Sequence, residues 1–239
     1  MSIKEFADRA LFALSVPKCV CCKSRLSYGE KAFCPECSAE FKDFSLRNCH
    51  KCARPLPECS CNSEMLSTHY IKKTVKCFRY LHRDERTPAN SLIYSLKREN
   101  REDVLCACID TLQSAIANNI GSPESFIFTN IPRRRAAIIE NGIDHSSLLA
   151  KGLAKRFNAE YRLLLKSNAK KPQKSLEKME RLKNADFEII EEMDLTDKKV
   201  IIVDDIITSG ASMAAAASLI RSLGCKYIVA ATLGIAYKD

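Results

Sequence analysis

The amino-acid sequence predicts an α/β protein, with a mainly parallel sheet flanked by helices and a small cysteine-rich module at its N-terminal end. Three observations predict this architecture. Segments with strand-like and helix-like patterns alternate after residue 70, which is typical of a parallel sheet with helical crossovers. Nine of the 13 cysteines gather between positions 19 and 61. Hydrophobic residues make up 46% of the 239 residues, which is enough for a sizeable core. We therefore expect two domains, 1–70 and 71–239.

The elements of the second domain follow from local patterns. Short runs of β-branched and aromatic residues predict strands, and apolar residues at helical spacing predict helices. The expected strands are 75–81, 125–130, 161–165, 187–190 and 200–203. The expected helices are 89–97, 102–119, 146–157 and 211–223, with Gly224 as the C-terminal stop of the last one.

The first 16 residues place apolar side chains at helical spacing with charges between them, which predicts an amphipathic helix and not a signal peptide. No apolar run reaches the roughly 18 residues that a membrane span needs. We therefore expect a cytoplasmic protein, with peripheral contact at the inner face of the membrane as a second possibility. The net charge is +9, and seven basic residues lie within 166–183. Such an excess suits a polyanion, either pyrophosphate or nucleic acid, although a solvated basic loop has the same composition.

The cysteines of the first domain are paired along the chain. Three pairs have two intervening residues, and a fourth pair has one. Two such pairs complete a tetrahedral zinc site, so eight cysteines suit two structural zinc ions. The sequential assignment places one site at Cys19, Cys22, Cys34 and Cys37, and the other at Cys49, Cys52, Cys59 and Cys61. An interleaved arrangement satisfies the same spacing. A disulfide framework would need an oxidising compartment, which the absence of a signal peptide argues against.

Residues 200–212 carry the most informative motif of the chain. A buried strand ends in the acidic pair Asp204 and Asp205, and a loop of small residues leads into an alanine-rich helix. Backbone N–H groups at such a helix start bind phosphate, and the carboxylates can accept hydrogen bonds from ribose hydroxyls. The stretch resembles the phosphoribosyl pyrophosphate (PRPP) motif of type I phosphoribosyltransferases. That resemblance implies that the acidic pair holds the ribose and that the 5′-phosphate is bound by Thr208, Ser209, Gly210, Ala211 and Ser212.

Two further basic segments suit a pyrophosphate. Arg133, Arg134 and Arg135 directly follow an expected strand, and ligands of open α/β sheets lie beyond the carboxyl ends of strands. The polar stretch from Gln173 to Asn184, which contains Arg181, has the length and composition of a lid over a site. A charged capping loop and simple disorder are the respective alternatives.

These motifs together resemble the ComF family, including the GntX-like proteins, in which a double zinc ribbon precedes a phosphoribosyltransferase domain. The resemblance rests on the cysteine pairs, the Asp-Asp loop and four further segments with the residue types and spacing of the family. These segments are Ile93 and Lys97, Pro132 to Arg135, Gly142 to His145, and Gln173, Leu176, Arg181 and Asn184. One departure is Asn141, where the family usually has arginine before the glycine.

The resemblance implies an enzyme of the glycosyltransferase class that binds PRPP with magnesium and transfers ribosyl phosphate to an unknown acceptor. Asp204, Asp205 and Arg181 are its candidate catalytic residues. It also implies a role in natural transformation, in which internalised single-stranded DNA reaches the cytoplasm with a partner helicase. Asn141 favours the alternative: a non-catalytic module that binds a nucleotide or nucleic acid, or senses PRPP, and docks the helicase.

Overall fold

The computed structural model describes residues 16–81, 87–133, 139, 143–168 and 187–236. Its elements come in the order expected for an α/β chain. The helical elements are α2 (Pro35–Ser45), η1 (Leu56–Glu58), α3 (Glu64–Thr68), α4 (Pro88–Arg98), α5 (Glu102–Ile120), α7 (His145–Arg156) and α9 (Ala211–Ser222). The strands are β1 (Ile71–Arg79), β2 (Phe126–Asn130), β3 (Glu160–Tyr161), β4 (Leu165–Ser167), β5 (Phe187–Ile189), β6 (Lys199–Ile207) and β7 (Tyr227–Ile235).

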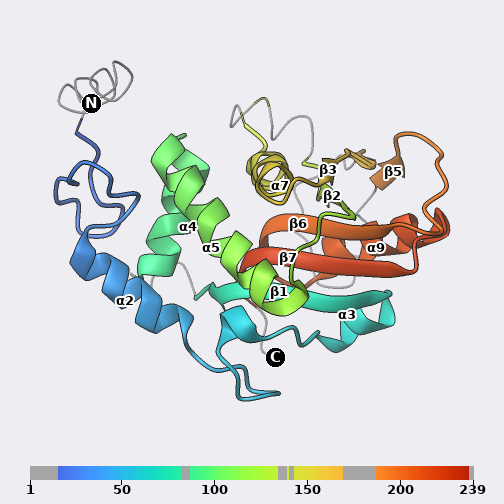
Figure 1. Cartoon of the computed structure of the whole chain (residues 1–239), viewed down its shortest axis with the longest axis horizontal. Coiled ribbons are helices and arrows are strands. Elements are labelled where there is room, and N and C mark those ends of the chain that lie inside the picture. Colours follow the sequence, from blue (N-terminus) through green and yellow to red (C-terminus); the bar gives the residue numbers. More distant parts are fainter. Residues whose placement is uncertain (1–15, 82–86, 134–138, 140–142, 169–186, 237–239) are drawn as a thin grey trace.

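Five strands form one sheet in the order β1-β7-β6-β2-β3, and every neighbouring pair in it is parallel. Helices α4, α5 and α7 pack on one face of this sheet, and α9 packs on the other (Figure 1). The mainly parallel sheet flanked by helices is therefore confirmed. The carboxyl end of β2 lies beside the residue of β6 that directly precedes the acidic pair, because Asn130 pairs with Val203 in the ladder.

Three expected strands differ in extent from the sequence prediction, and β7 was not predicted. The strand expected at 75–81 begins four residues earlier, at Ile71, and ends at Arg79 as β1. β6 continues beyond Val203 through the acidic pair to Ile207, because β7 continues the parallel ladder beside it as far as Ile235. The expected strand 161–165 divides in two. Its first part extends the main sheet as β3, and its last residue starts β4, which pairs antiparallel with β5 in a separate two-stranded sheet.

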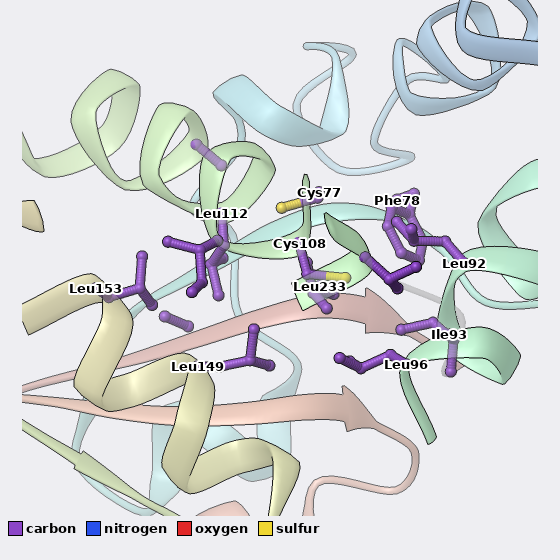
Figure 2. Close-up of a cluster of buried hydrophobic side chains, with 14 of the residues drawn as sticks. Cys77, Phe78, Leu92, Ile93, Leu96, Cys108, Leu112, Leu149, Leu153 and Leu233 are labelled. Carbon is purple, nitrogen blue, oxygen red and sulfur yellow. The ribbon is translucent and has the colours of Figure 1, made fainter. Parts of the chain in front are cut away.

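The core between the sheet and its three-helix face is aliphatic and aromatic. Leu92, Ile93 and Leu96 of α4 converge on Phe78 of β1 and Leu233 of β7 (Figure 2). Cys77 and Cys108 lie in the same cluster and are fully buried. Burial of each large side chain contributes on the order of 2 kcal/mol to folding. These two cysteines therefore act as small apolar residues, as their surroundings in the sequence predict.

The cysteine-rich part packs against the sheet on both faces. Cys19, Phe33 and Phe44 belong to the core on the three-helix face, and Leu56 and Leu66 belong to the core on the α9 face. Each core thus contains residues from both sides of position 70. The division into domains 1–70 and 71–239 remains a proposal. The amphipathic helix expected over the first 16 residues lies outside the described residues, apart from its last position.

Strand β1 lies at an edge of the main sheet, and a segment of the cysteine-rich part covers it. The backbone N–H of Thr74 donates to the carbonyl of Ser60 at 3.2 Å, and the Asn62 side-chain amide donates to the carbonyl of Ile71 at 2.7 Å. The Thr74 hydroxyl also donates to Asn62 Oδ1 at 2.7 Å.

Within the described residues, no helix has the length and apolar character needed to cross a membrane.

Candidate functional site

The acidic pair lies near the carboxyl end of β6, where side chains from three other segments meet it. Asp205 is 4% exposed, and Asp204 is partly exposed. The chain after β2 reaches the pair because the backbone N–H of Ile131 continues the ladder to the carbonyl of Val203 at 3.0 Å. Arg133 therefore stands three residues beyond the end of β2, beside the carboxylates.

Asp205 forms ion pairs with two cations. Its Oδ2 lies 2.6 Å from Arg133 Nη2 and 3.0 Å from Lys97 Nζ. Burial pushes the pKa of Asp205 upward, but Lys97 and Arg133 together outweigh it and hold that pKa below its ordinary value. Asp205 is therefore ionised at neutral pH, and two cations are gathered at the strand end.

Asp204 has a different environment. Ser146, in the first turn of α7, donates its hydroxyl to Asp204 Oδ1 at 2.9 Å. Burial and the neighbouring charge of Asp205 raise the pKa of Asp204 to about 7, against the effect of that hydrogen bond. The adjacent carboxylates thus differ in charge near neutrality, and a ligand that hydrogen-bonds to the ionised form of Asp204 would favour its ionisation.

His145 lies near the acidic pair and is 2% exposed. Neither of its ring nitrogens forms a hydrogen bond with the part of the chain that the structure describes. Burial and the positive charge of Arg133 lower its pKa, partly opposed by Asp205. The imidazole is therefore neutral at pH 7. An unsatisfied buried polar group costs about 1–3 kcal/mol.

A hydrogen-bonded network holds the start of α7 in place. Asp144 caps this helix by accepting from the Ser147 N–H at 3.2 Å, and it lies 4.0 Å from Arg133 Nε. The fully buried Asn130 accepts from the Tyr161 hydroxyl at 2.8 Å. This network links β2, β3 and α7, and so fixes Ser146 and Arg133 relative to β6.

The loop from Thr208 to Gly210 connects β6 to α9. Gly210 has a φ of +85°, a conformation that favours glycine. A Cβ at this position would lie 3.1 Å from Leu66 Cδ2, so α3 packs directly against the loop. Gly210 occupies the cap position of α9 without a side chain, and the Ser209 hydroxyl accepts a long hydrogen bond of 3.4 Å from the Ala211 N–H. The N–H groups of a helix start of this kind suit an anion. This arrangement can bind a phosphate group, as the motif predicts.

The eight cysteines form two clusters in sequential order, one of Cys19, Cys22, Cys34 and Cys37 and one of Cys49, Cys52, Cys59 and Cys61. Within each cluster all four sulfurs lie within 4.8 Å of one another, and every cysteine is a free thiol. Tetrahedral zinc with Zn–S bonds of about 2.3 Å separates its sulfurs by about 3.8 Å. The Cys22–Cys34 and Cys52–Cys59 sulfurs are each 3.6 Å apart. Both clusters are compatible with structural zinc, and the interleaved arrangement is wrong.

The thiols already differ in acidity. The hydrogen bonds with Ser24 lower the pKa of Cys22 to about 6, and the backbone N–H of Arg54 lowers that of Cys52 to about 7. Burial raises the pKa of Cys59 to about 12. Each cluster thus contains one thiol that is readily ionised for a metal.

The structure brings together some of the sequence-predicted site residues. Asp204, Asp205 and Arg133 meet, with the loop from Thr208 to Ser212 beginning a few residues further along the chain. Arg134, Arg135, Asn141, Arg181 and the segment 173–184 lie outside the described residues. Lys97 and Ser146 were not among the predicted site residues. Lys97 belongs to the helix that resembles the ComF family, but the resemblance gives it no role in the site. No local pattern marks Ser146 as a partner of Asp204.

Comparison with known proteins agrees with this geometry. The family model described as the phosphoribosyl transferase domain matches residues 113–236, which is slightly more than half of the chain. No curated protein matches the chain. The matched region runs from within α5 to the end of β7 and contains Arg133, the acidic pair and the loop before α9.

Proposed function

The chain belongs to the phosphoribosyl transferase domain family, and from that premise we propose that it binds PRPP with magnesium and transfers the ribosyl phosphate to an acceptor. The observation that carries the proposal is the pairing of Asp205 with Lys97 and Arg133 at the carboxyl end of β6. The hydroxyls of a ribose could bind to the carboxylates here, and the diphosphate of the same ligand could bind to the adjacent cations.

The proposed roles follow from the chemistry of each group. The carboxylates of Asp204 and Asp205 accept hydrogen bonds from the ribose hydroxyls. The backbone around Gly210 and the start of α9 bind the 5′-phosphate. Lys97 and Arg133 attract the diphosphate, and Arg134, Arg135 and Arg181 add to them. In the transfer, the C1′–oxygen bond to pyrophosphate breaks with its electron pair going to pyrophosphate, a bond from C1′ to the acceptor forms, and the proton of the acceptor passes to the released pyrophosphate.

Electrostatics is the main contribution of these side chains. Positive charge fixed where the pyrophosphate leaves stabilises the transition state more than the ground state. The carboxylate oxygens are hard donors of the kind that magnesium prefers. When bound, magnesium would neutralise part of the diphosphate charge. His145 is buried near Arg133 and Asp205. Because its ring is neutral, it adds no further positive charge beside Arg133.

The test is calorimetric titration of the full chain with PRPP and magnesium, beside the variants Asp204→Asn and Asp205→Asn. We expect both variants to lose most of the binding. Asp194→Asn is the matched control, because Asp194 contacts Thr196 before β6 begins. Release of pyrophosphate on addition of candidate acceptors then measures transfer. Absence of PRPP binding at millimolar concentration would contradict the proposal. Full binding by a chain that carries both Asp204→Asn and Asp205→Asn would contradict the assignment of these carboxylates to the binding site.

We further propose that the chain is a ComF-type protein, with two structural zinc ions and a cytoplasmic role in natural transformation beside a helicase. The two tetracysteine clusters ahead of the transferase region support this proposal, because free thiols bind zinc in a reducing compartment. Disruption of the gene in a naturally competent host should lower transformation without altering growth. A normal transformation frequency would remove this part of the proposal and leave the PRPP site untouched.

A second candidate function is non-catalytic binding of nucleic acid. Its support is a hollow of about 180 Å³ lined by Tyr70, Lys72, Arg221 and Lys226, with the Arg221 guanidinium 5.4 Å from the centre of the Tyr70 ring. An aromatic ring among cations suits a single strand. Binding of single-stranded DNA should then fall steeply with salt, and Arg221→Met should reduce the salt slope relative to Arg156→Met. Identical slopes for the two variants would contradict this candidate.

A further inference from the structure

Lys76 is a lysine in the interior of the protein. It lies in the middle of β1, is 0% exposed, and is among the largest of the fully buried side chains in the described residues. Removing an ammonium group from water costs several kcal/mol unless an opposite charge or a set of acceptors compensates it. A neutral side chain of the same length would avoid this cost, so the charge needs a partner.

The contacts of Lys76 lead to the second tetracysteine cluster. Its Nζ donates to the carbonyl oxygen of Cys61 at 2.6 Å, and its charge acts on Cys59. Among the described residues, no carboxylate lies within 4.0 Å of this ammonium. The anion that faces Lys76 is therefore to be found in the cluster of Cys49, Cys52, Cys59 and Cys61.

A metal in this cluster would supply that anion. Four thiolates around one divalent zinc carry a net charge of −2, and the ion itself sets the local electrostatics. Cys49 and Cys59 are 2% and 1% exposed, so solvent screens this charge weakly. Burial alone does not separate the two clusters, because Cys19, Cys34 and Cys37 of the first cluster are buried as well. What distinguishes the second cluster is the buried ammonium of Lys76, which donates to the carbonyl oxygen of its ligand residue Cys61.

The same segment that carries two of the ligands also covers the edge of the sheet. Between Cys59 and Asn62, the backbone and side chains bond to Ile71, Thr74 and Lys76 of β1. A metal that fixes Cys59 and Cys61 therefore also fixes the cover of β1. Loss of the metal would leave Lys76 without its anion and loosen that cover.

We propose that Lys76 is the buried counter-cation of a metal–tetrathiolate centre at Cys49, Cys52, Cys59 and Cys61, and that it ties metal binding there to the edge strand of the transferase sheet. The inference rests on the proposed zinc sites and is independent of PRPP binding. Groups of this kind outside the ligand shell alter metal affinity by about 10- to 100-fold.

The first experiment measures zinc content and affinity in the full chain, by elemental analysis and by competition with a chromophoric chelator. Lys76→Met keeps an unbranched side chain, one heavy atom shorter, and removes its charge. The matched control is Lys73→Met on the same strand, whose ammonium donates to the Asn119 carbonyl instead. We expect Lys76→Met to weaken one of two zinc sites by about tenfold or more and Lys73→Met to weaken neither.

A second experiment separates charge compensation from packing. Cys52→Ser removes one ligand of the second site, and thermal unfolding is then compared with and without Lys76→Met. If Lys76 balances the metal centre, Lys76→Met lowers the melting temperature of the parent chain and lowers it less, or raises it, in the Cys52→Ser background. This arm also applies if Lys76→Met alone fails to fold.

Three outcomes would overturn the inference. The first is unchanged affinity at both zinc sites in Lys76→Met, and the second is an equal loss at both sites. The third is an equal destabilisation in the two backgrounds, including failure to fold in both, because the lysine would then act through packing alone. A parent chain that holds a single zinc would show that the second metal centre is absent, and the inference would fall with it.

Discussion

Replacement of Asp204 by asparagine should stabilise the free protein while it removes PRPP binding. Burial and Asp205 raise the pKa of Asp204 to about 7 from an ordinary value of 3.8. A group with a raised pKa in the folded state favours folding when it is protonated, and it opposes folding as the pH rises through about 4 to 7. Asparagine has nearly the same shape, carries no charge, and can still accept the hydrogen bond from Ser146.

The magnitude follows from the shift. About 3 pKa units at about 1.4 kcal/mol each give an upper bound of about 4 kcal/mol above pH 7. Because Asp204 is partly exposed, the protein and solvent relax around the charge, and we expect a gain of about 2 kcal/mol. For a chain of this length, 1 kcal/mol moves the melting temperature by about 2–4 °C. The expected increase is therefore about 4–8 °C at pH 8, and it should be smaller at pH 5, which lies below the raised pKa of Asp204.

The assay is thermal unfolding of the zinc-loaded chain at pH 5 and pH 8, in buffer free of magnesium and phosphate. Asp205→Asn is the comparison, since it leaves Lys97 and Arg133 without their carboxylate and should lower the melting temperature. The reasoning is refuted if Asp204→Asn melts below the parent at pH 8, or if its gain is the same at both pH values.

Three other changes test the packing around the site. Gly224→Ala should lower the free energy of unfolding in urea by about 2 kcal/mol, because φ is +93° and the new Cβ would lie 2.6 Å from Thr196 Oγ1. Gly29 also has a positive φ, but a Cβ there would have no atom within 4 Å, so Gly29→Ala should lower it by only about 1 kcal/mol. Tyr161→Phe leaves a buried amide oxygen without its donor, so PRPP affinity and stability should both fall, the latter by about 1–2 kcal/mol; unchanged unfolding would contradict the network. His145→Phe removes two unpartnered nitrogens and should raise stability by about 1 kcal/mol at pH 7. Because burial lowers the His145 pKa below 6.5, the parent should lose stability as the pH falls below 6.5, and His145→Phe should lose less; parallel pH profiles would contradict this.

Local patterns predicted most of the fold. Apolar spacing located α4, α5, α7 and α9 to within a few residues, and β-branched runs located β2, β5 and β6. The end of β6 was wrong because Asp204 and Asp205 are poor strand residues, and only the partner strand β7 keeps them in the ladder. The neighbour in the sheet, and not the local sequence, decided the length of this strand.

The candidate site could be predicted only in part. Asp204 and Asp205 carry a local signature, since they stand between a strand and a phosphate-type loop. Lys97 reaches Asp205 from more than 100 positions away, because α4 packs on a face of the sheet whose central strand, β6, carries Asp205. Nothing in the sequence around Ser146 specifies Asp204 as its partner. Contacts of this kind depend on strand order, which spacing along the chain does not encode.

The cover on β1 also bears on how the protein avoids self-association. A sheet edge with unpaired backbone groups is a template for strands of other molecules. The opposite edge is formed by β3, which is two residues long and offers little template. At the β1 edge, the Ser60 and Asn62 contacts occupy groups that a foreign strand would otherwise use. A shortened chain that began at residue 71 would expose nine residues of edge strand and should aggregate, so the cysteine-rich part protects the transferase region from its own copies.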